Sequence, residues 1–198
     1  MVRVPITDET TDRELVARLQ DGAEDAFDEL VRRHQQRALN VAFQILRDHE
    51  DAVEVAQDAF VSVYRHIGTF RGDAEFTTWL HQIVINLARN KHRWWKRRGR
   101  QAAVSLDAPV ATHDGELRRD PPSPTDPPDA AVVKAEFVQQ IGAAMERLPR
   151  KFREVLVLRN VEEMSYEEIS TVLGCSVGTV KSRIARAREA LKERMQHD

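Results

Sequence analysis

Residues 165–188 read Ser165-Tyr-Glu-Glu-Ile-Ser-Thr-Val-Leu-Gly-Cys-Ser-Val-Gly-Thr-Val-Lys-Ser-Arg-Ile-Ala-Arg-Ala-Arg188 and carry the signals of two helices joined by a tight turn. Ser165 can cap the first helix, and Glu168, three residues on, can complete a capping box. Gly174 lies where a left-handed residue would end that helix, and Ser176 can cap the next one. Two helices joined in this way, the second of them basic, predict a helix-turn-helix.

The second of these helices has an apolar face and a polar face. Its apolar residues recur at steps of three and four, as Val177, Val180, Ile184, Ala187 and Leu191. The opposite face carries Ser182, Ala185 and Arg186, whose hydroxyl, methyl and guanidinium groups suit the reading of base edges. Lys181, Arg183 and Arg188 flank that face and suit phosphates. A merely solvated basic helix is the alternative, but the caps, the glycine and the short turn favour DNA reading.

The whole chain divides into two units, and the helix-turn-helix belongs to the second. Val133, Phe137, Ile141, Met145 and Leu148 predict one helix, and Pro149 suits the first turn of another that carries Phe152, Val155 and Leu156. Six of the eight prolines lie from Pro109 to Pro128, in a stretch without apolar periodicity. We therefore expect domains at 1–100 and 131–198, joined by a flexible, acidic, proline-rich linker at 101–130.

Residues 1–100 are expected to form a helical bundle. Apolar side chains recur at helical spacing in three segments, and no alternating run is typical of a strand. The three sets are Phe27, Leu30, Val31, Ala38, Val41, Ala42 and Ile45; Val53, Ala56, Phe60, Val63, Tyr64 and Ile67; and Trp79, Leu80, Ile83, Val84 and Leu87. The predicted fold class is all-α, with two helical domains.

The formal net charge of −2 conceals a strong ordering of charge along the chain. Residues 89–100 hold seven bases and no acid, a block whose self-repulsion favours a phosphate backbone as partner. The pair Trp94-Trp95 within it has two readings, as core anchors or as platforms for unpaired bases. The second predicted helix has an acidic outer face, at Glu50, Asp51, Glu54 and Asp58. Composition favours a solvated face there, and a docking face for a basic or polar partner is the alternative.

Several classes of protein are excluded by composition. No apolar run approaches the roughly 18 residues of a membrane span, and the amino terminus lacks the apolar core of a secretory signal. The single cysteine, Cys175, excludes a disulfide framework and a cysteine-cluster zinc site, and it suits a turn better than a reactive thiol. Because no metal, phosphate-loop or nucleophile motif is present, we expect no cofactor and no enzymatic activity. The expected compartment is intracellular and reducing.

Five stretches together resemble one known family. They are Ala26-Phe-Asp-Glu-Leu-Val31; Asp51-Ala-Val-Glu-Val-Ala-Gln-Asp-Ala-Phe60; Thr69-Phe-Arg-Gly-Asp73 with Phe76-Thr-Thr-Trp-Leu80; Leu148-Pro149 with Arg153; and Ser165-Tyr-Glu-Glu-Ile169 through Val177–Arg188. With these five stretches in this order, the chain resembles a bacterial extracytoplasmic-function (ECF) sigma factor, the minimal class of RNA polymerase sigma subunit. The resemblance covers nearly the whole chain apart from the linker and the tails.

The resemblance implies sigma domains 2 and 4 and assigns roles to residues in each. Domain 2 would dock on core RNA polymerase, on the clamp helices of its largest subunit, through Asp51, Glu54, Gln57 and Asp58. It would also open the minus-ten element, holding a flipped base in the loop from Phe70 to Thr77. The minus-ten residues are then Phe70, Gly72, Phe76, Asn86, Arg89, Lys91, Arg93, Arg97 and Arg98. Domain 4 would meet the flap of the second-largest subunit and read the minus-thirty-five element through Lys181, Ser182, Ala185 and Arg186, with Arg183 and Arg188 beside them.

The implied partners are thus core polymerase and promoter DNA, with no small-molecule substrate. Many members of the family also bind an anti-sigma factor, often anchored in the membrane, and the expected location is the cytoplasm. The linker would thread polymerase channels toward the RNA exit path. A stand-alone helix-turn-helix regulator is the alternative, but such proteins usually carry a second domain built on β-strands. The all-helical first unit disfavours that class.

Overall fold

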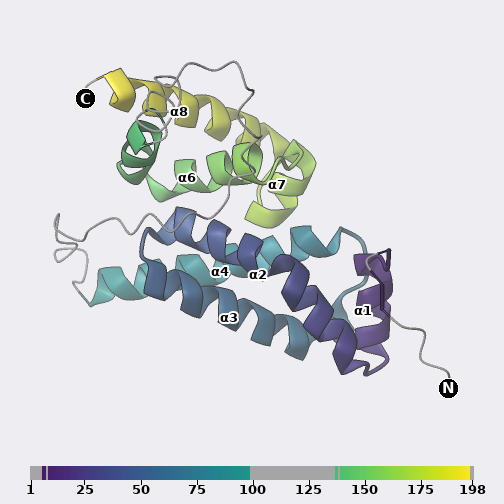
Figure 1. Ribbon diagram of the computed structural model, residues 1–198. Coiled ribbons are helices and arrows are strands. Elements are labelled where there is room, and N and C mark those ends of the chain that lie inside the picture. Colours follow the sequence, from purple (N-terminus) through teal and green to yellow (C-terminus); the bar gives the residue numbers. More distant parts are fainter. Residues whose placement is uncertain (1–5, 8, 99–136, 138, 197–198) are drawn as a thin grey trace, which may run out of the picture.

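The computed structural model describes all residues except 1–5, 8, 99–136, 138 and 197–198 (Figure 1). Its first unit holds α1 (Asp12–Gln20), α2 (Glu24–Leu46), α3 (His49–His66), the short helix η1 (Ile67–Thr69) and α4 (Phe76–Arg97). Its second unit holds a helical stretch at 139–146, α6 (Arg150–Leu156), the π-helical turn η3 (Val157–Val161), α7 (Tyr166–Leu173) and α8 (Val177–Gln196). None of the described residues forms a strand, so the all-α prediction is confirmed. The predicted linker at 101–130 lies outside the described residues.

The first unit is a bundle of α2, α3 and α4, with α1 at one end (Figure 1). The first and third predicted apolar sets are buried in its core or packed against it, and α2, α3 and α4 each contribute fully buried side chains, such as Leu30, Val63 and Leu80 respectively. Tyr64 departs from the prediction, because it is 49% exposed, although its ring makes a T-shaped contact with that of Phe27. No helix in the described part of the chain is long and apolar enough to cross a membrane.

Helix α1 was not predicted, although its signals are present in the sequence. The side chain of Thr11 accepts a hydrogen bond from the backbone N–H of Glu14, and the Glu14 carboxylate accepts one from the backbone N–H of Thr11. This capping box starts a helix that buries Leu15, Val16 and Leu19 against the bundle. The acid-rich composition of residues 1–30 masks this short apolar face.

The second unit confirms the predicted helix-turn-helix. Ser165 and Glu168 form the reciprocal capping box, and Gly174 ends α7 with φ 64° and ψ 44°, in the left-handed region. The side chain of Ser176 accepts a hydrogen bond from the backbone N–H of Thr179 at 3.2 Å, which caps α8. Pro149 occupies the N-cap of α6, directly before the first helical residue.

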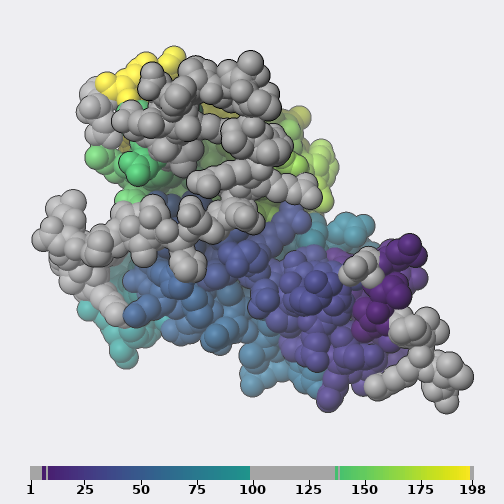
Figure 2. Space-filling view, in the orientation of Figure 1, coloured from purple at the N-terminus to yellow at the C-terminus, as the bar shows by residue number. Residues whose placement is uncertain are grey.

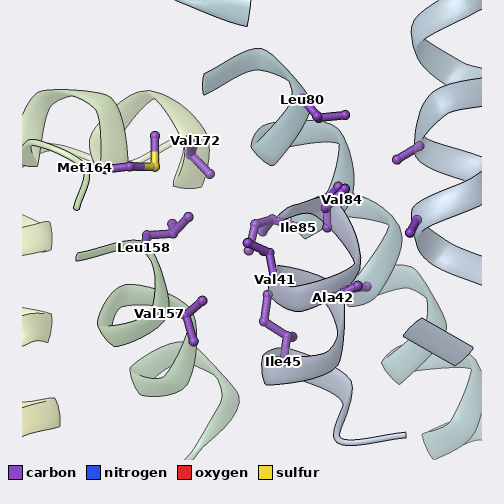
Figure 3. Close-up of a cluster of buried hydrophobic side chains, with 14 of the residues drawn as sticks. Val41, Ala42, Ile45, Leu80, Val84, Ile85, Val157, Leu158, Met164 and Val172 are labelled. Atoms are coloured by element: carbon purple, nitrogen blue, oxygen red, sulfur yellow. The ribbon is translucent and has the colours of Figure 1, made fainter. Parts of the chain in front are cut away.

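The two units share one continuous apolar core, a feature that the sequence did not predict. Figure 3 shows Val41 and Ile45 of α2 and Ile85 of α4 facing the second unit. From that unit come Val157, Leu158, Met164 and Val172, and every one of these seven side chains is buried. Figure 2 shows the green and yellow second unit seated directly against the blue and teal helices of the first. The chain therefore folds here as a closed two-unit body.

Candidate nucleic-acid interface

Helix α8 presents the predicted reading face to solvent. Val180, Ile184 and Ala187 are buried, and the opposite side exposes Lys181, Ser182, Ala185, Arg186 and Arg188. Arg183 differs from the other flanking cations, because it is half-buried and its guanidinium lies 3.8 Å from the sulfur of Cys175. The backbone carbonyl of Cys175 accepts a hydrogen bond from the Ser170 hydroxyl at 2.6 Å. Cys175 thus serves the turn, as expected, and Arg183 braces it from α8.

The polar and basic side chains at the C-terminal end of α4 point in three directions. Asn86, Asn90, Arg93 and Arg97, spaced four, three and four residues apart, form one exposed stripe. Three of these residues, with Lys96, line a hollow at that end of the helix. Arg89 instead points to α6, where its Nη2 donates to Glu154 at 2.8 Å, and Lys91 points to α3. The exposed cations at this end, Arg93, Lys96, Arg97 and Arg98, therefore form the surface that suits a phosphate backbone, and Arg89 and Lys91 do not belong to it.

Trp94 and Trp95, for which the sequence leaves two readings open, have different environments. Trp95 packs against the core, and its indole nitrogen is buried. Trp94 lies at the surface under cations, with the guanidinium of Arg98 at 4.5 Å and the ammonium of Lys91 at 5.6 Å from its ring. Such cation–π contacts hold the charges of this helix end in place. Trp95 thus serves as a core anchor, whereas the ring of Trp94 lies beneath two cations of the helix end.

A small pocket of about 200 Å³ lies between the loop before α4 and the helix itself. The loop contributes Thr69, Phe70, Arg71, Gly72, Asp73 and Ala74, α4 contributes Thr78, Trp79 and Gln82, and α7 contributes Thr171. The rings of Phe70 and Trp79 lie 4.9 Å apart and tilted by 38°. Gly72 adopts φ 75°, which glycine tolerates best. The pocket is smaller than the roughly 300–1,000 Å³ typical of drug-sized ligands and suits one planar group.

Two residues around this pocket differ from the sequence-based prediction. Phe76 was expected to line the pocket, but it is only 3% exposed and packs beneath the loop against Phe70 and Trp79. Gln20 of α1 was not predicted, yet its amide donates to the carbonyls of Ile67 and Phe70 at 2.9 and 2.8 Å. A lone glutamine gives no such signal in sequence. Gln20 fixes the loop from outside, and Phe76 supports it from below.

The acidic face of α3 is exposed at Glu54, Gln57 and Asp58. It continues along the same side of the helix into two exposed apolar residues, Val61 and Tyr64. Asp51 does not belong to this surface, because it is 7% exposed and lies 2.9 Å from the ammonium of Lys91. The face is therefore acidic at one end and apolar at the other, a combination that suits a protein partner.

Comparison with known proteins identifies the family of this chain. Residues 30–101 match the family model described as Sigma-70 region 2, and residues 138–191 match Sigma-70, region 4. The chain is 40% identical over 187 residues to the RNA polymerase sigma-H factor of Pseudomonas aeruginosa, covering 93% of this chain and 94% of that protein. It is 34% identical over 192 residues to the ECF RNA polymerase sigma-E factor of Escherichia coli K12, covering 96% and 97%. The chain belongs to the ECF family of RNA polymerase sigma factors.

As an ECF sigma factor, the protein initiates transcription at specific promoters and is not an enzyme. The region 2 match begins within α2 and includes α3, the pocket loop and α4, while the region 4 match includes α6, α7 and α8 as far as residue 191. A stand-alone helix-turn-helix regulator is thereby set aside, since the first unit is itself a sigma region. The fold is also similar to CnrH, solved in complex with the cytosolic domain of CnrY. The TM-score to CnrH is 0.65 at 29% identity, covering 94% of this sigma factor and 98% of that chain.

Proposed function

We propose that the pocket before α4 captures one flipped base of the minus-ten element, while the exposed stripe of α4 holds the adjoining phosphates. The observation that carries this proposal is the pocket itself, which is lined in part by Trp79 of α4 and is followed about one turn later on that helix by exposed Asn86. Unstacking a base costs a few kcal/mol, and stacking on an aromatic ring returns about 1–3 kcal/mol per base. A preformed pocket, together with phosphate contacts at the exposed cations farther along α4, offsets the remainder.

The exposed face of α8 reads the minus-thirty-five element in this proposal. Arg186 is its most specific group, because a guanidinium can bind a guanine edge through two hydrogen bonds. Ser182 and Ala185 supply a hydroxyl and a methyl beside it, and Lys181 and Arg188 contact phosphates. Arg183 contributes mainly by bracing Cys175 at the turn, because its side chain is half-buried.

The exposed face of α3 docks on core polymerase in this proposal. Glu54, Gln57 and Asp58 form its polar part, and Val61 with Tyr64 gives it an apolar anchor. The partner surface is that of the clamp helices of the largest subunit, and the flap of the second-largest subunit meets the second unit. Buried Asp51 acts from inside, by holding Lys91 and hence the spacing of α3 and α4.

A further partner is proposed from the relative CnrH, whose structure contains the cytosolic domain of a second protein, CnrY. We propose that this sigma factor is likewise bound by an anti-sigma factor. Its location is then the cytoplasm, on the nucleoid when it is bound to polymerase and at the membrane when a membrane-anchored anti-sigma factor holds it.

Transcription with purified components tests the proposed function. The full chain together with core polymerase should start transcription at a cognate promoter, and the chain alone should bind that duplex weakly. Tight, sequence-specific binding by the chain alone, unaffected by core enzyme, would contradict the proposal. E54K/D58K should lose core binding, whereas E163K/E167K, exposed in the second unit, makes the same charge change and should retain it. Equal core affinity of both variants would refute docking through α3.

A further inference from the structure

Gln20, the last residue of α1, is hydrogen-bonded to the segment that begins the pocket before α4. Its side-chain Nε2 donates to the backbone carbonyl of Ile67 at 2.9 Å and to that of Phe70 at 2.8 Å. The first carbonyl belongs to the start of η1, and the second to the residue directly after it. Because an amide –NH₂ group carries two donors, one side chain can satisfy both carbonyls. Gln20 therefore joins α1 to the pocket segment.

Local hydrogen bonds shape the same segment. The backbone N–H of Phe70 donates to the carbonyl of Ile67 at 3.0 Å, and the hydroxyl of Thr69 donates to the carbonyl of His66 at 2.7 Å. Each of these bonds joins residues three positions apart, so they set the form of the turn without placing it against another helix. The bonds from Gln20 supply that placement, because they come from a separate helix.

Helix α1 is a firm support for this contact. It buries side chains such as Leu15 and Leu19 against the bundle. At its first residue, the Oδ2 atom of Asp12 lies 2.6 Å from Nε2 of buried His34 in α2. The hydrogen bond with His34 holds the pKa of Asp12 below its usual value. Since α1 is fixed at its start and along its apolar face, Gln20 at its end is held within reach of the pocket segment.

Phe70 carries the effect of Gln20 into the pocket. Its backbone carbonyl accepts the hydrogen bond from Gln20, while Phe70 itself lines the pocket together with Trp79. The centroid of its ring lies 4.9 Å from that of Trp79 and 6.4 Å from that of Phe76. Phe70 is thus held at its backbone by α1 and at its ring by α4. One wall of the pocket is therefore in place before any base enters.

We propose that Gln20 is a positioning residue for base capture, which holds the carbonyls of Ile67 and Phe70 so that the pocket keeps the shape that accepts a flipped base. This inference rests on the proposed function of the pocket. The region 2 match begins at residue 30, so α1 lies outside it. A preformed pocket spends no binding energy on ordering its loop. If the loop is released, only the fraction with the correct shape binds the base, and the apparent affinity falls with that fraction.

Hydrogen exchange of the full chain tests the support of the loop. Q20E keeps the shape of the side chain but replaces its donating nitrogen by a carboxylate oxygen, which repels both carbonyls. Q35E makes the same change at an exposed glutamine of α2 and is the matched control. Exchange at residues 67–74, followed by mass spectrometry, should be about tenfold faster in Q20E and unchanged in Q35E. Unchanged exchange there in Q20E would overturn the role of Gln20.

Binding by the complex of the full chain with core polymerase tests the captured base. The probe is a fluorescent single strand carrying the minus-ten element of a promoter that this complex transcribes, with copies that each lack one base. For the wild type and Q35E, removal of the base at one position should weaken binding about tenfold, as expected for one stacked base. For Q20E this loss should shrink to about twofold, because the intact strand binds more weakly and the abasic strand binds equally.

A purely structural role of Gln20 predicts another pattern. Q20E would then weaken binding of the intact and abasic strands by the same factor, and this result would overturn the positioning role alone. A wild-type complex that tolerates removal of every single base would overturn the proposed capture of a base, and the role of Gln20 with it.

Q20K tests the link between the loop and the base, because lysine keeps N–H donors on a side chain of similar length. It should restore slow exchange at residues 67–74 and at least about half of the tenfold loss on base removal. A Q20K variant with slow exchange but no base-dependent loss would overturn the inference.

Discussion

The ammonium of Lys91 in α4 lies 2.9 Å from a carboxylate oxygen of Asp51 in α3, and both side chains are largely buried. The sequence assigns Lys91 to DNA and Asp51 to core polymerase, yet the two residues bind each other. Burial lowers the pKa of Lys91, but hydrogen bonds to Glu54 and Asp51 outweigh it, so the pKa lies above its usual value. The pair joins α3 to α4, which makes its role structural.

Asp51→Asn should therefore destabilise the fold rather than abolish docking directly. Losing a charged hydrogen bond in a mostly buried position should lower the free energy of unfolding by about 1–3 kcal/mol, as measured by urea unfolding. Asp58→Asn, on the exposed part of the same helix, should change it by less than about 0.5 kcal/mol. The affinity for core polymerase, measured on folded protein, should instead fall more in D58N than in D51N. A stable D51N variant with lost core binding would restore Asp51 to the docking surface.

The residues predicted well from sequence are those whose partners are close in the chain. The capping box of Ser165 with Glu168 and the left-handed Gly174 are local, so α7 and the turn follow from the amino-acid sequence alone. Apolar spacing predicted α2, α3 and α4. It could not predict that Tyr64, at the end of its apolar stripe, is exposed or that Phe76 is buried. Periodicity gives a helix face, and tertiary packing decides how far that face is covered.

Contacts between distant residues could not be predicted in the same way. Arg89 and Glu154 are 65 residues apart, and each is one of many charges of its sign. The basic block is uniform in sequence, whereas its members turn toward α3, α6 and solvent because successive helical residues point about 100° apart. The closed arrangement of the two units was missed for the same reason. The apolar residues at the contact between the two units have a helical spacing that fits two separate cores equally well.

Gly174 and Gly178 should respond in opposite directions to the same substitution. Gly174 has φ 64°, and no atom lies within 4 Å of an added Cβ, so Gly174→Ala should cost about 1–2 kcal/mol from backbone strain alone. Gly178 is the second residue of α8, where an added Cβ meets only an ordinary contact at 3.9 Å, so Gly178→Ala should stabilise by up to about 0.5 kcal/mol. Thermal unfolding of the two variants checks the signs. Equal effects would show that Gly174 is not held in this conformation for the turn.

Glu29 should make stability depend on pH in the acid range. Hydrogen bonds from Arg32 and then Arg33 hold the pKa of Glu29 at about 2, below its usual value of 4.5. A lowered folded pKa means that the unfolded state takes up the proton first. The contribution is therefore complete above pH 4.5 and lost as the pH falls toward about 2.

Urea unfolding at a series of pH values checks this effect. Glu29→Gln should be less stable than the wild type near neutral pH, and the difference should shrink as the pH falls toward 2. Arg32→Met should produce the same convergence to a smaller extent, because Arg33 remains. A difference between wild type and E29Q that is constant over this pH range would show that the ion pairs do not set the pKa.

Arg97 and Arg186 should affect promoter binding in different ways. Arg97 lies on the exposed stripe of α4 and is expected to contact only phosphate, so Arg97→Ala should weaken binding of the polymerase complex about equally at all promoters. The slope of log affinity against log salt should become shallower by about 0.7–0.9 for one lost phosphate contact.

Arg186→Ala should instead relax the base preference at one minus-thirty-five position, at a cost of about 1–3 kcal/mol in binding free energy. Lys151→Ala, exposed on α6, removes a charge outside both surfaces and should change neither quantity. Competition among promoter variants at several salt concentrations measures both effects, and a promoter-selective loss in R97A would contradict its backbone role.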